Sequence, residues 1–143
     1  MKKTLTVALE AEPNNPDMLL LVKGLSDYNA AHANGDVPKY LLVTVKDGEG
    51  ELAGGLLGAT YLGWLQIQVV WLDDSIRGEG YGSALMALAE EEALRRGVAK
   101  AFVETLSFQA LPFYEKLGYE VFSRLADFPP GGARYALTKN LGT

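Results

Sequence analysis

The sequence contains no cysteine and a single histidine, His32, among its 143 residues. The absence of cysteine excludes a disulfide scaffold, cysteine-containing zinc sites, iron–sulfur ligation and a cysteine nucleophile. One histidine excludes metal sites built from several histidines and makes any Ser-His-Asp triad depend on that residue. We therefore predict a protein without a metal.

Long apolar runs and an excess of basic residues are also missing. The 13 basic and 18 acidic residues give a net charge of −5, whereas a nucleic-acid-binding domain normally carries a basic stripe. The N-terminal Met1-Lys2-Lys3 begins as a signal peptide does, but acidic residues interrupt the segment that follows. No stretch approaches the ~18–20 apolar residues of a membrane span. We expect a cytoplasmic protein that binds neither nucleic acid nor membrane, and a cationic substrate is compatible with its charge.

The length suits one domain spanning residues 1–143. A helix capped by Asp17 is expected to fade near residues 30–35, with further helices ending near Arg96 and at about 109–117. Alternation and turn signals predict strands at 5–9, 40–45, 51–61, 64–72, 101–106, 119–125 and 133–138. This order predicts an α/β (α+β) domain with a mixed, mostly antiparallel sheet of six to seven strands and about four helices.

A glycine-rich loop separates the strand at 64–72 from the most regular helix, whose apolar stripe is Leu85, Met86, Ala89 and Ala93. Glycines allow a tight turn with exposed N–H groups, and a helix N-terminus adds about half a positive charge, so the loop suits a pyrophosphate. The spacing is not that of a dinucleotide-binding fingerprint, and no Lys-Ser/Thr follows as in a P-loop. A glycine-rich turn that binds nothing is the alternative.

Two motifs together resemble the Gcn5-related N-acetyltransferase (GNAT) family. The loop reads Arg77-x-x-Gly80-x-Gly82 after its strand, and the downstream segment reads Ala110-x-x-Phe113-Tyr114-Glu115-Lys116-Leu117-Gly118-Tyr119. The resemblance is close over residues 64–121 and loose over the N-terminal half. It implies an acetyl-CoA-binding fold whose central strands, at 64–72 and 101–106, splay apart to admit the pantetheine arm.

The resemblance also implies the cofactor-binding residues. Backbone amides of the loop would hold the pyrophosphate, the strand before it would offer backbone groups to the thioester and pantetheine, and Ser107 takes the place of a usual Asn that contacts the cofactor arm. The implied set is Val70, Trp71, Leu72, Arg77, Gly78, Glu79, Gly80, Tyr81, Gly82, Ser83, Ser107 and Gln109. Tyr114 matches the tyrosine that in many members protonates the departing CoA thiolate.

The general base is harder to identify, because the strand at 64–72 carries glutamines where some family members carry a glutamate. Glu104 is the best-placed acid. Strand alternation puts it on one face with Phe102 and Leu106, and partial burial would raise its pKa toward neutrality. A solvated or salt-bridged Glu104 is the alternative, and His32 or a water chain are further candidate bases.

We therefore predict an acetyl-CoA-dependent N-acetyltransferase in which a primary amine attacks directly within a ternary complex. A small-molecule acceptor is preferred over a protein or peptide. A catalytically inactive acyl-CoA-binding module and a nucleotide-binding regulator are the alternatives from other classes. Homodimers are frequent in the family, and the strands at 119–125 and 133–138 offer an edge for one.

Overall fold

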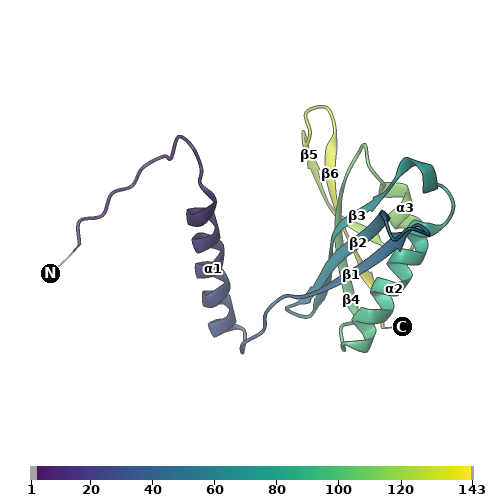
Figure 1. The fold of residues 1–143 in the computed structure, drawn as a ribbon, viewed down its shortest axis with the longest axis horizontal. Helices are drawn as coiled ribbons and strands as arrows, with labels where there is room; N and C mark the ends of the chain where they lie inside the picture. The colour runs from purple at the N-terminus through teal and green to yellow at the C-terminus, as the bar shows by residue number, and fades with distance from the viewer. Residues whose placement is uncertain (1–2, 143) are drawn as a thin grey trace. The chain divides into compact units, whose positions relative to one another are not determined.

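A computed structural model describes residues 3–142 of the chain (Figure 1). Contacts divide the chain into two compact units, Met1–Val37 and Pro38–Thr143, and each is described by itself. The single domain spanning residues 1–143 stays a prediction.

The first unit contains one helix, α1 (Asn15–His32). Its N-cap is Asn14, whose Oδ1 accepts from the backbone N–H of Asp17 at 2.9 Å. The expected Asp17 cap is therefore wrong, because the carboxylate lies within the first turn and Asn14 caps the helix instead. The predicted strand at 5–9 is also wrong, since the described residues 3–10 have no regular secondary structure. Alternation is a local pattern, whereas a strand also needs backbone hydrogen bonds to a partner strand.

The second unit is a six-stranded sheet with two α-helices. Its strand order is β1-β2-β3-β4-β6-β5, and every neighbouring pair is antiparallel except β3 with β4. The mostly antiparallel α/β sheet is thus confirmed with six strands, and the described residues hold three α-helices and one 3-10 turn. The elements are β1 (Lys39–Lys46), β2 (Leu52–Tyr61), β3 (Trp64–Leu72), η1 (Asp74–Ile76), α2 (Tyr81–Arg95), β4 (Lys100–Leu106), α3 (Leu111–Lys116), β5 (Glu120–Ala126) and β6 (Ala133–Asn140).

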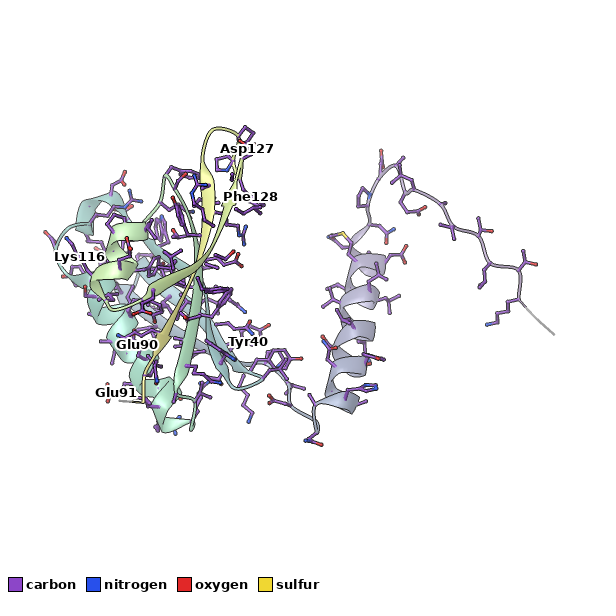
Figure 2. All side chains as sticks on the ribbon, turned by 180° about the vertical axis from the view of Figure 1, so that it is seen from behind. Tyr40, Glu90, Glu91, Lys116, Asp127 and Phe128 are labelled. Atoms are coloured by element: carbon purple, nitrogen blue, oxygen red, sulfur yellow. The ribbon has the colours of Figure 1, made fainter. Side chains whose placement is uncertain are left out.

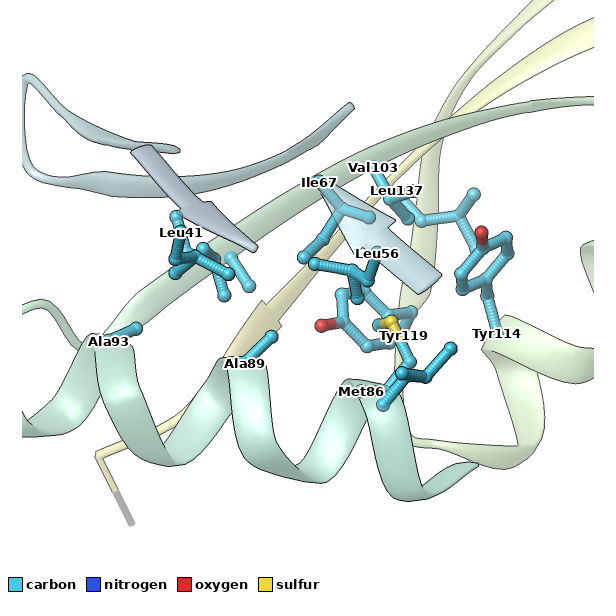
Figure 3. Close-up of a cluster of buried hydrophobic side chains, with 13 residues drawn as sticks. Leu41, Leu56, Ile67, Met86, Ala89, Ala93, Val103, Tyr114, Tyr119 and Leu137 are labelled. Atoms are coloured by element: carbon cyan, nitrogen blue, oxygen red, sulfur yellow. The ribbon is translucent and has the colours of Figure 1, made fainter. Parts of the chain in front are cut away.

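The hydrophobic core lies between one face of this sheet and the helices α2 and α3. Figure 3 shows Met86, Ala89 and Ala93 of α2 directed at the sheet, with Tyr114 rising from α3 beside them. The predicted stripe of α2 is confirmed, because all four of its side chains are buried. The sheet contributes the fully buried side chains Leu56, Leu65, Val103 and Leu137.

Strand β3 carries a bulge at Gln68. In its pairing with β2, Gly58 lies opposite Ile67 and Leu57 lies opposite Val69, so Gln68 has no partner in that ladder. An extra residue reverses the side-chain alternation of a strand. Strict alternation along β3 would place Ile67, Val69 and Trp71 on one face, and the bulge ends this pattern after Ile67.

The bulge has a clear effect on burial. Ile67 is buried, but Val69 and Trp71 are 52% and 47% exposed. The residues between and after them, Val70 and Leu72, pack against the core in their place. In the second half of β3, Val70 and Leu72 therefore point to the core, and Val69 and Trp71 point to the opposite face. Simple alternation predicts the reverse.

Strands β3 and β4 pair only at their beginnings. Three residue pairs join them, from Leu65↔Ala101 to Ile67↔Val103, and the pairing stops just before the bulge. From there the two central strands run on without pairing to each other, which confirms the predicted splay.

Arg96, at the C-terminal end of α2, forms hydrogen bonds with the edge strand β1 and its neighbour β2. Its guanidinium donates to the carbonyl oxygens of Lys39 and Tyr40 at 2.8 and 3.1 Å, to Thr60 Oγ1 at 3.1 Å and to Glu92 Oε2 at 2.7 Å. Arg96 thus forms an ion pair with Glu92 on the preceding helical turn and also links the end of the helix to β1 and β2.

We predict that Arg96→Ala lowers the free energy of unfolding by about 2–3 kcal/mol, because four acceptors lose their donor together and two of these hydrogen bonds, to Glu92 and Thr60, are partly buried. Urea unfolding followed by circular dichroism measures the change. The matched control is Arg95→Ala, whose 72% exposed side chain bonds to Glu92 and whose loss should leave the midpoint nearly unchanged. Equal destabilisation by both variants would contradict a stabilising role for the hydrogen bonds between Arg96 and the sheet.

Candidate active site

A cavity of about 1060 Å³ opens where β3 and β4 part. Because neighbouring residues of a strand point to opposite faces, its walls show that the cavity reaches both sides of the sheet. Val103 and Thr105 line it from the helix face, and Glu104 between them lines it from the other face. The opening therefore passes through the sheet, so that two reactants entering from opposite faces can meet in it.

On the helix face, the cavity is closed by the N-terminus of α2. Its N-cap is Gly80, with φ +91°, and no side chain caps this end by a hydrogen bond. The first bond of the helix runs from Ala84 N–H to the Gly80 carbonyl at 3.2 Å. The preceding amides, up to Ser83, are thus available to an anion, and the helix dipole favours negative charge there.

Arg77 lines the same end of the cavity and is held in place by its neighbours. Its Nε donates to the Leu72 carbonyl oxygen at 2.9 Å, and its Nη1 forms an ion pair with Asp74 at 2.6 Å. The side chain is largely exposed, so its remaining N–H groups can reach a phosphate. An arginine at a helix N-terminus adds a cation to the anion site.

A glycine at position 82 is also needed for the packing of α3 against α2. A Cβ at this position would lie 3.1 and 3.2 Å from two ring atoms of Phe113, so the absence of a side chain lets α3 pack on the first turn of α2. A bulky residue at Gly82 would disturb this packing as well as any ligand, and it cannot test binding alone.

The cavity brings together most of the predicted site residues. Glu79, Tyr81 and Ser107 are not among its lining residues; the hydroxyl of Ser107 instead accepts from Ala133 N–H at 3.0 Å. Gln109 lines the cavity, yet its Oε1 also accepts from Leu106 N–H at 2.8 Å and so closes the loop before α3. The predicted residues that line it are Val70, Trp71, Leu72, Arg77, Gly78, Gly80, Gly82, Ser83, Glu104, Gln109 and Tyr114.

Tyr114 stands on α3 with its ring in the core and is only 6% exposed. The rings of Phe113 and Tyr119 meet it edge-on, with centroids 5.1 and 6.0 Å away. Within residues 3–142 its hydroxyl has no hydrogen-bond partner, and it faces the cavity. Burial raises the pKa of Tyr114 above its ordinary value, so the phenol stays protonated at neutral pH and can donate a proton.

A partly buried polar cluster that sequence reasoning missed holds Tyr119, whose ring packs against Tyr114. The hydroxyl of Tyr119 donates to Glu90 Oε2 at 2.9 Å, and Lys139 Nζ donates to Glu90 Oε1 at 2.8 Å. Glu90 sits in a run of three glutamates that reads as a solvated helix face, and Figure 2 shows it on α2. The signal that could have found it is its spacing: Glu90 follows Met86 by one helical turn, on the border of the apolar stripe.

Glu104 is bound by an arginine rather than buried alone. Its Oε2 accepts from Arg134 Nε at 2.6 Å. The register of β4 with β6 sets Glu104 opposite Ala136 and Leu106 opposite Arg134, which places Arg134 diagonally across on the same face. The hydrogen bond from Arg134 holds the pKa of Glu104 below its ordinary value. The expected rise toward neutrality is therefore wrong, and the salt-bridged alternative is the observed one.

His32, the other candidate base, is the last residue of α1 and belongs to the first unit. Its Nδ1 lies 2.8 Å from the Tyr28 carbonyl oxygen, and its ring stacks on Tyr28 with centroids 4.2 Å apart. Both contacts are made within the helix, and a role for His32 in proton transfer stays a prediction.

The described residues contain neither a metal-binding cluster nor a helix that could span a membrane. Among residues 3–142, no three side chains of the metal-binding types lie close enough together to hold an ion. Over the same residues, none of the helices has the length and apolar character needed to cross a bilayer.

Comparison with known proteins identifies relatives of this fold and site. The family model of the Acetyltransferase (GNAT) family matches residues 8–119. A blasticidin-S acetyltransferase from Streptomyces morookaense is 42% identical over 106 residues, which cover 73% of this chain and 78% of that protein. An acetyltransferase from Agrobacterium fabrum is 34% identical over 73% of this chain and 76% of its own length. The crystal structure of an acetyltransferase from Bacillus cereus superposes with a TM-score of 0.78 at 28% identity, over 94% of this chain and 98% of that one.

The anion site at α2 can be tested at Ser83, which is exposed, lines the cavity and lies in the first turn of the helix. We predict that coenzyme A raises the melting temperature of the wild type and of Ser83→Ala, because a ligand that binds only the folded state stabilises it. Ser83→Asp should fold at least as stably as the wild type, since a carboxylate favours a helix N-terminus. The same carboxylate should repel the pyrophosphate and abolish the shift. A full shift in Ser83→Asp would place the phosphates elsewhere.

Proposed function

The chain belongs to the GNAT acetyltransferase family, and from this premise we propose that it transfers an acetyl group from acetyl-CoA to a primary amine of a small molecule. Family membership, with a 42% identical acetyltransferase among its relatives, makes it an acetyl-transferring enzyme. The observation that carries the proposal is the cavity through the sheet, which has a helix N-terminus on one face and Glu104 on the other.

The donor enters from the helix face in this proposal. GNAT acetyltransferases use acetyl-CoA, and the free amides at the start of α2 suit its pyrophosphate. The thioester and pantetheine arm extend along β3 beyond Ile67, where the ladder to β4 has ended. Backbone groups of Val70, Trp71 and Leu72 on that edge have no partner on β4 and can bond the amides of the arm.

The acetyl transfer then needs a proton at the leaving group. The amine nitrogen attacks the thioester carbonyl carbon, the C–S bond of the tetrahedral species breaks, and the sulfur departs as a thiolate. Tyr114 supplies its phenolic proton to that sulfur, the nitrogen gives up a proton to solvent, and solvent returns a proton to the Tyr114 phenolate. Glu104 is a weak base in this scheme because Arg134 holds its pKa low. The acceptor amine therefore loses its proton through water.

The acceptor is a small-molecule amine of the antibiotic type, a choice supported by the similarity to a blasticidin-S acetyltransferase. Protein or peptide acceptors are the second candidate, and the inactive acyl-CoA-binding module the third. The cytoplasmic location and the homodimer stay predictions.

The proposal is tested by thiol release from acetyl-CoA in the presence of blasticidin S, simple primary amines and peptides with a free N-terminus. Mass spectrometry identifies the product, which should be an amide heavier than the acceptor by one acetyl group. Turnover on small amines is the expected result. Turnover on peptides alone would favour the second candidate, and tight CoA binding without turnover on any acceptor would favour the inactive module.

Tyr114→Phe removes the proposed acid while keeping the ring packed between Phe113 and Tyr119. We predict that kcat falls by about 10²–10⁴-fold, the usual contribution of one general acid, with the affinity for acetyl-CoA retained. Steady-state rates together with calorimetric CoA titration separate the two quantities. Tyr40→Phe on β1, where the side chain is exposed, is the matched control and should keep the wild-type rate. An unchanged kcat in Tyr114→Phe would exclude this residue as the acid.

The pH profile gives a second test of Tyr114. An acid must be protonated to act, so kcat falls as pH rises through its pKa. Because burial raises the pKa of Tyr114 above 10.0, any alkaline fall due to this phenol should lie above pH 10. A Tyr114-dependent limb between pH 7 and 9 would contradict the raised pKa.

A further inference from the structure

We propose that Glu104 anchors a second cationic group of the acceptor, so that the preferred substrate is a small amine that also carries a guanidinium or another ammonium group. This inference rests on the proposed function and names the substrate class for the same cavity. It assigns Glu104 to acceptor specificity, in place of the general base that its position in the sequence suggested.

One of the two carboxylate oxygens of Glu104 is bound within the protein. Oε2 accepts from Arg134, and within residues 3–142 the second oxygen, Oε1, has no hydrogen-bond partner. Glu104 lines the cavity, whereas Arg134 is not among its lining residues. The arginine therefore holds the carboxylate from outside the cavity, and the group presented to a ligand is the anion.

Arg134 is itself held in position. Its guanidinium lies over the ring of Phe128, 4.9 Å from the centroid, and Figure 2 shows Phe128 at the tip of the hairpin between β5 and β6. Ser107 and Ala133 join this hairpin to the loop after β4 by two hydrogen bonds, from Ser107 N–H at 2.8 Å and to Ser107 Oγ at 3.0 Å. The carboxylate thus has a defined orientation before a ligand arrives, which lowers the entropy lost on binding.

The charge state of Glu104 suits binding rather than proton transfer. A carboxylate whose pKa is held below the ordinary value is fully ionised at neutral pH and has little tendency to take a proton from an ammonium. Its free oxygen can accept a charge-assisted hydrogen bond from a cation, which is about twice as strong as a neutral one. The net charge of −5 further favours the approach of a cation.

Aromatic residues line the cavity as well, and its basic lining residues, Arg77 and Lys116, come from the loop before α2 and from α3. Trp71 and Phe108 line it with rings that are 47% and 70% exposed, and aromatic faces attract ammonium and guanidinium groups. A carboxylate-bearing acceptor would meet the Glu104 anion instead. Glu104 also lies on the face opposite Tyr114, so a cation bound there leaves the amine of the same molecule free to enter the opening.

The experiment compares agmatine, which has a primary amine and a guanidinium, with n-butylamine, which has the amine alone. The wild type should have a kcat/KM for agmatine at least about tenfold above that for n-butylamine, mainly through KM. Glu104→Gln keeps the size of the side chain and removes its charge, and should reduce the agmatine-to-butylamine ratio by about tenfold. Glu91→Gln on α2, at an exposed residue that does not line the cavity, is the matched control and should keep the ratio of the wild type.

Two results would contradict the proposal that Glu104 binds a cationic group of the acceptor. One is an unchanged ratio in Glu104→Gln. The other is an equal loss of kcat with both amines together with a displaced acidic limb of the pH profile, which would make Glu104 the base. Absence of thiol release with every amine would instead contradict the proposed function. In that event, calorimetric titration of agmatine into the CoA-loaded protein still decides the anchor, because Glu104→Gln must weaken that binding by about tenfold if the inference holds.

Discussion

The parallel pairing of β3 with β4 ends at Ile67↔Val103, and the bulge at Gln68 begins where it stops. Two neighbouring central strands that do not pair leave backbone groups without partners, an arrangement that is costly in a closed core. It is tolerated here because the gap forms the cavity, where a ligand or solvent can bond those groups. The cavity, the exposed edge of β3 and the access from two faces all depend on this single interruption of the sheet.

The gap between β3 and β4 also places different chemical groups on the two faces of the sheet. In the proposed function, the N-terminus of α2 and the buried phenol of Tyr114 would supply an anion site and a proton donor on the helix face. On the other face, Glu104 presents an ionised carboxylate fixed by Arg134. Strand β4 serves both sides through alternation, since Val103 and Thr105 point one way and Glu104 the other. A donor and an acceptor can therefore approach each other without competing for the same surface.

The contacts that hold Tyr114 and α2 in place join residues that are distant in the sequence. Glu90 of α2 joins Tyr119 and Lys139, and the ring of Tyr119 packs against Tyr114. Arg96 similarly joins the end of α2 to the far edge of the sheet. Each contact satisfies a polar group at the border of the core, as burial requires. Together they hold α2 and α3 against the sheet, so that the anion site and the phenol keep their places along one cavity.

Local patterns in the sequence were sufficient for features that depend on neighbouring residues: the glycine loop before α2, its buried stripe, the face of β4 that carries Glu104, and the second motif with Tyr114. The tertiary structure decided the rest. The bulge at Gln68 reversed the faces of Val69 and Trp71, and the register between β4 and β6 brought Arg134 to Glu104 and reversed the expected shift of its pKa. The physical reason is that periodicity sets which way a side chain points, whereas its partner depends on which strand lies beside it and in what register.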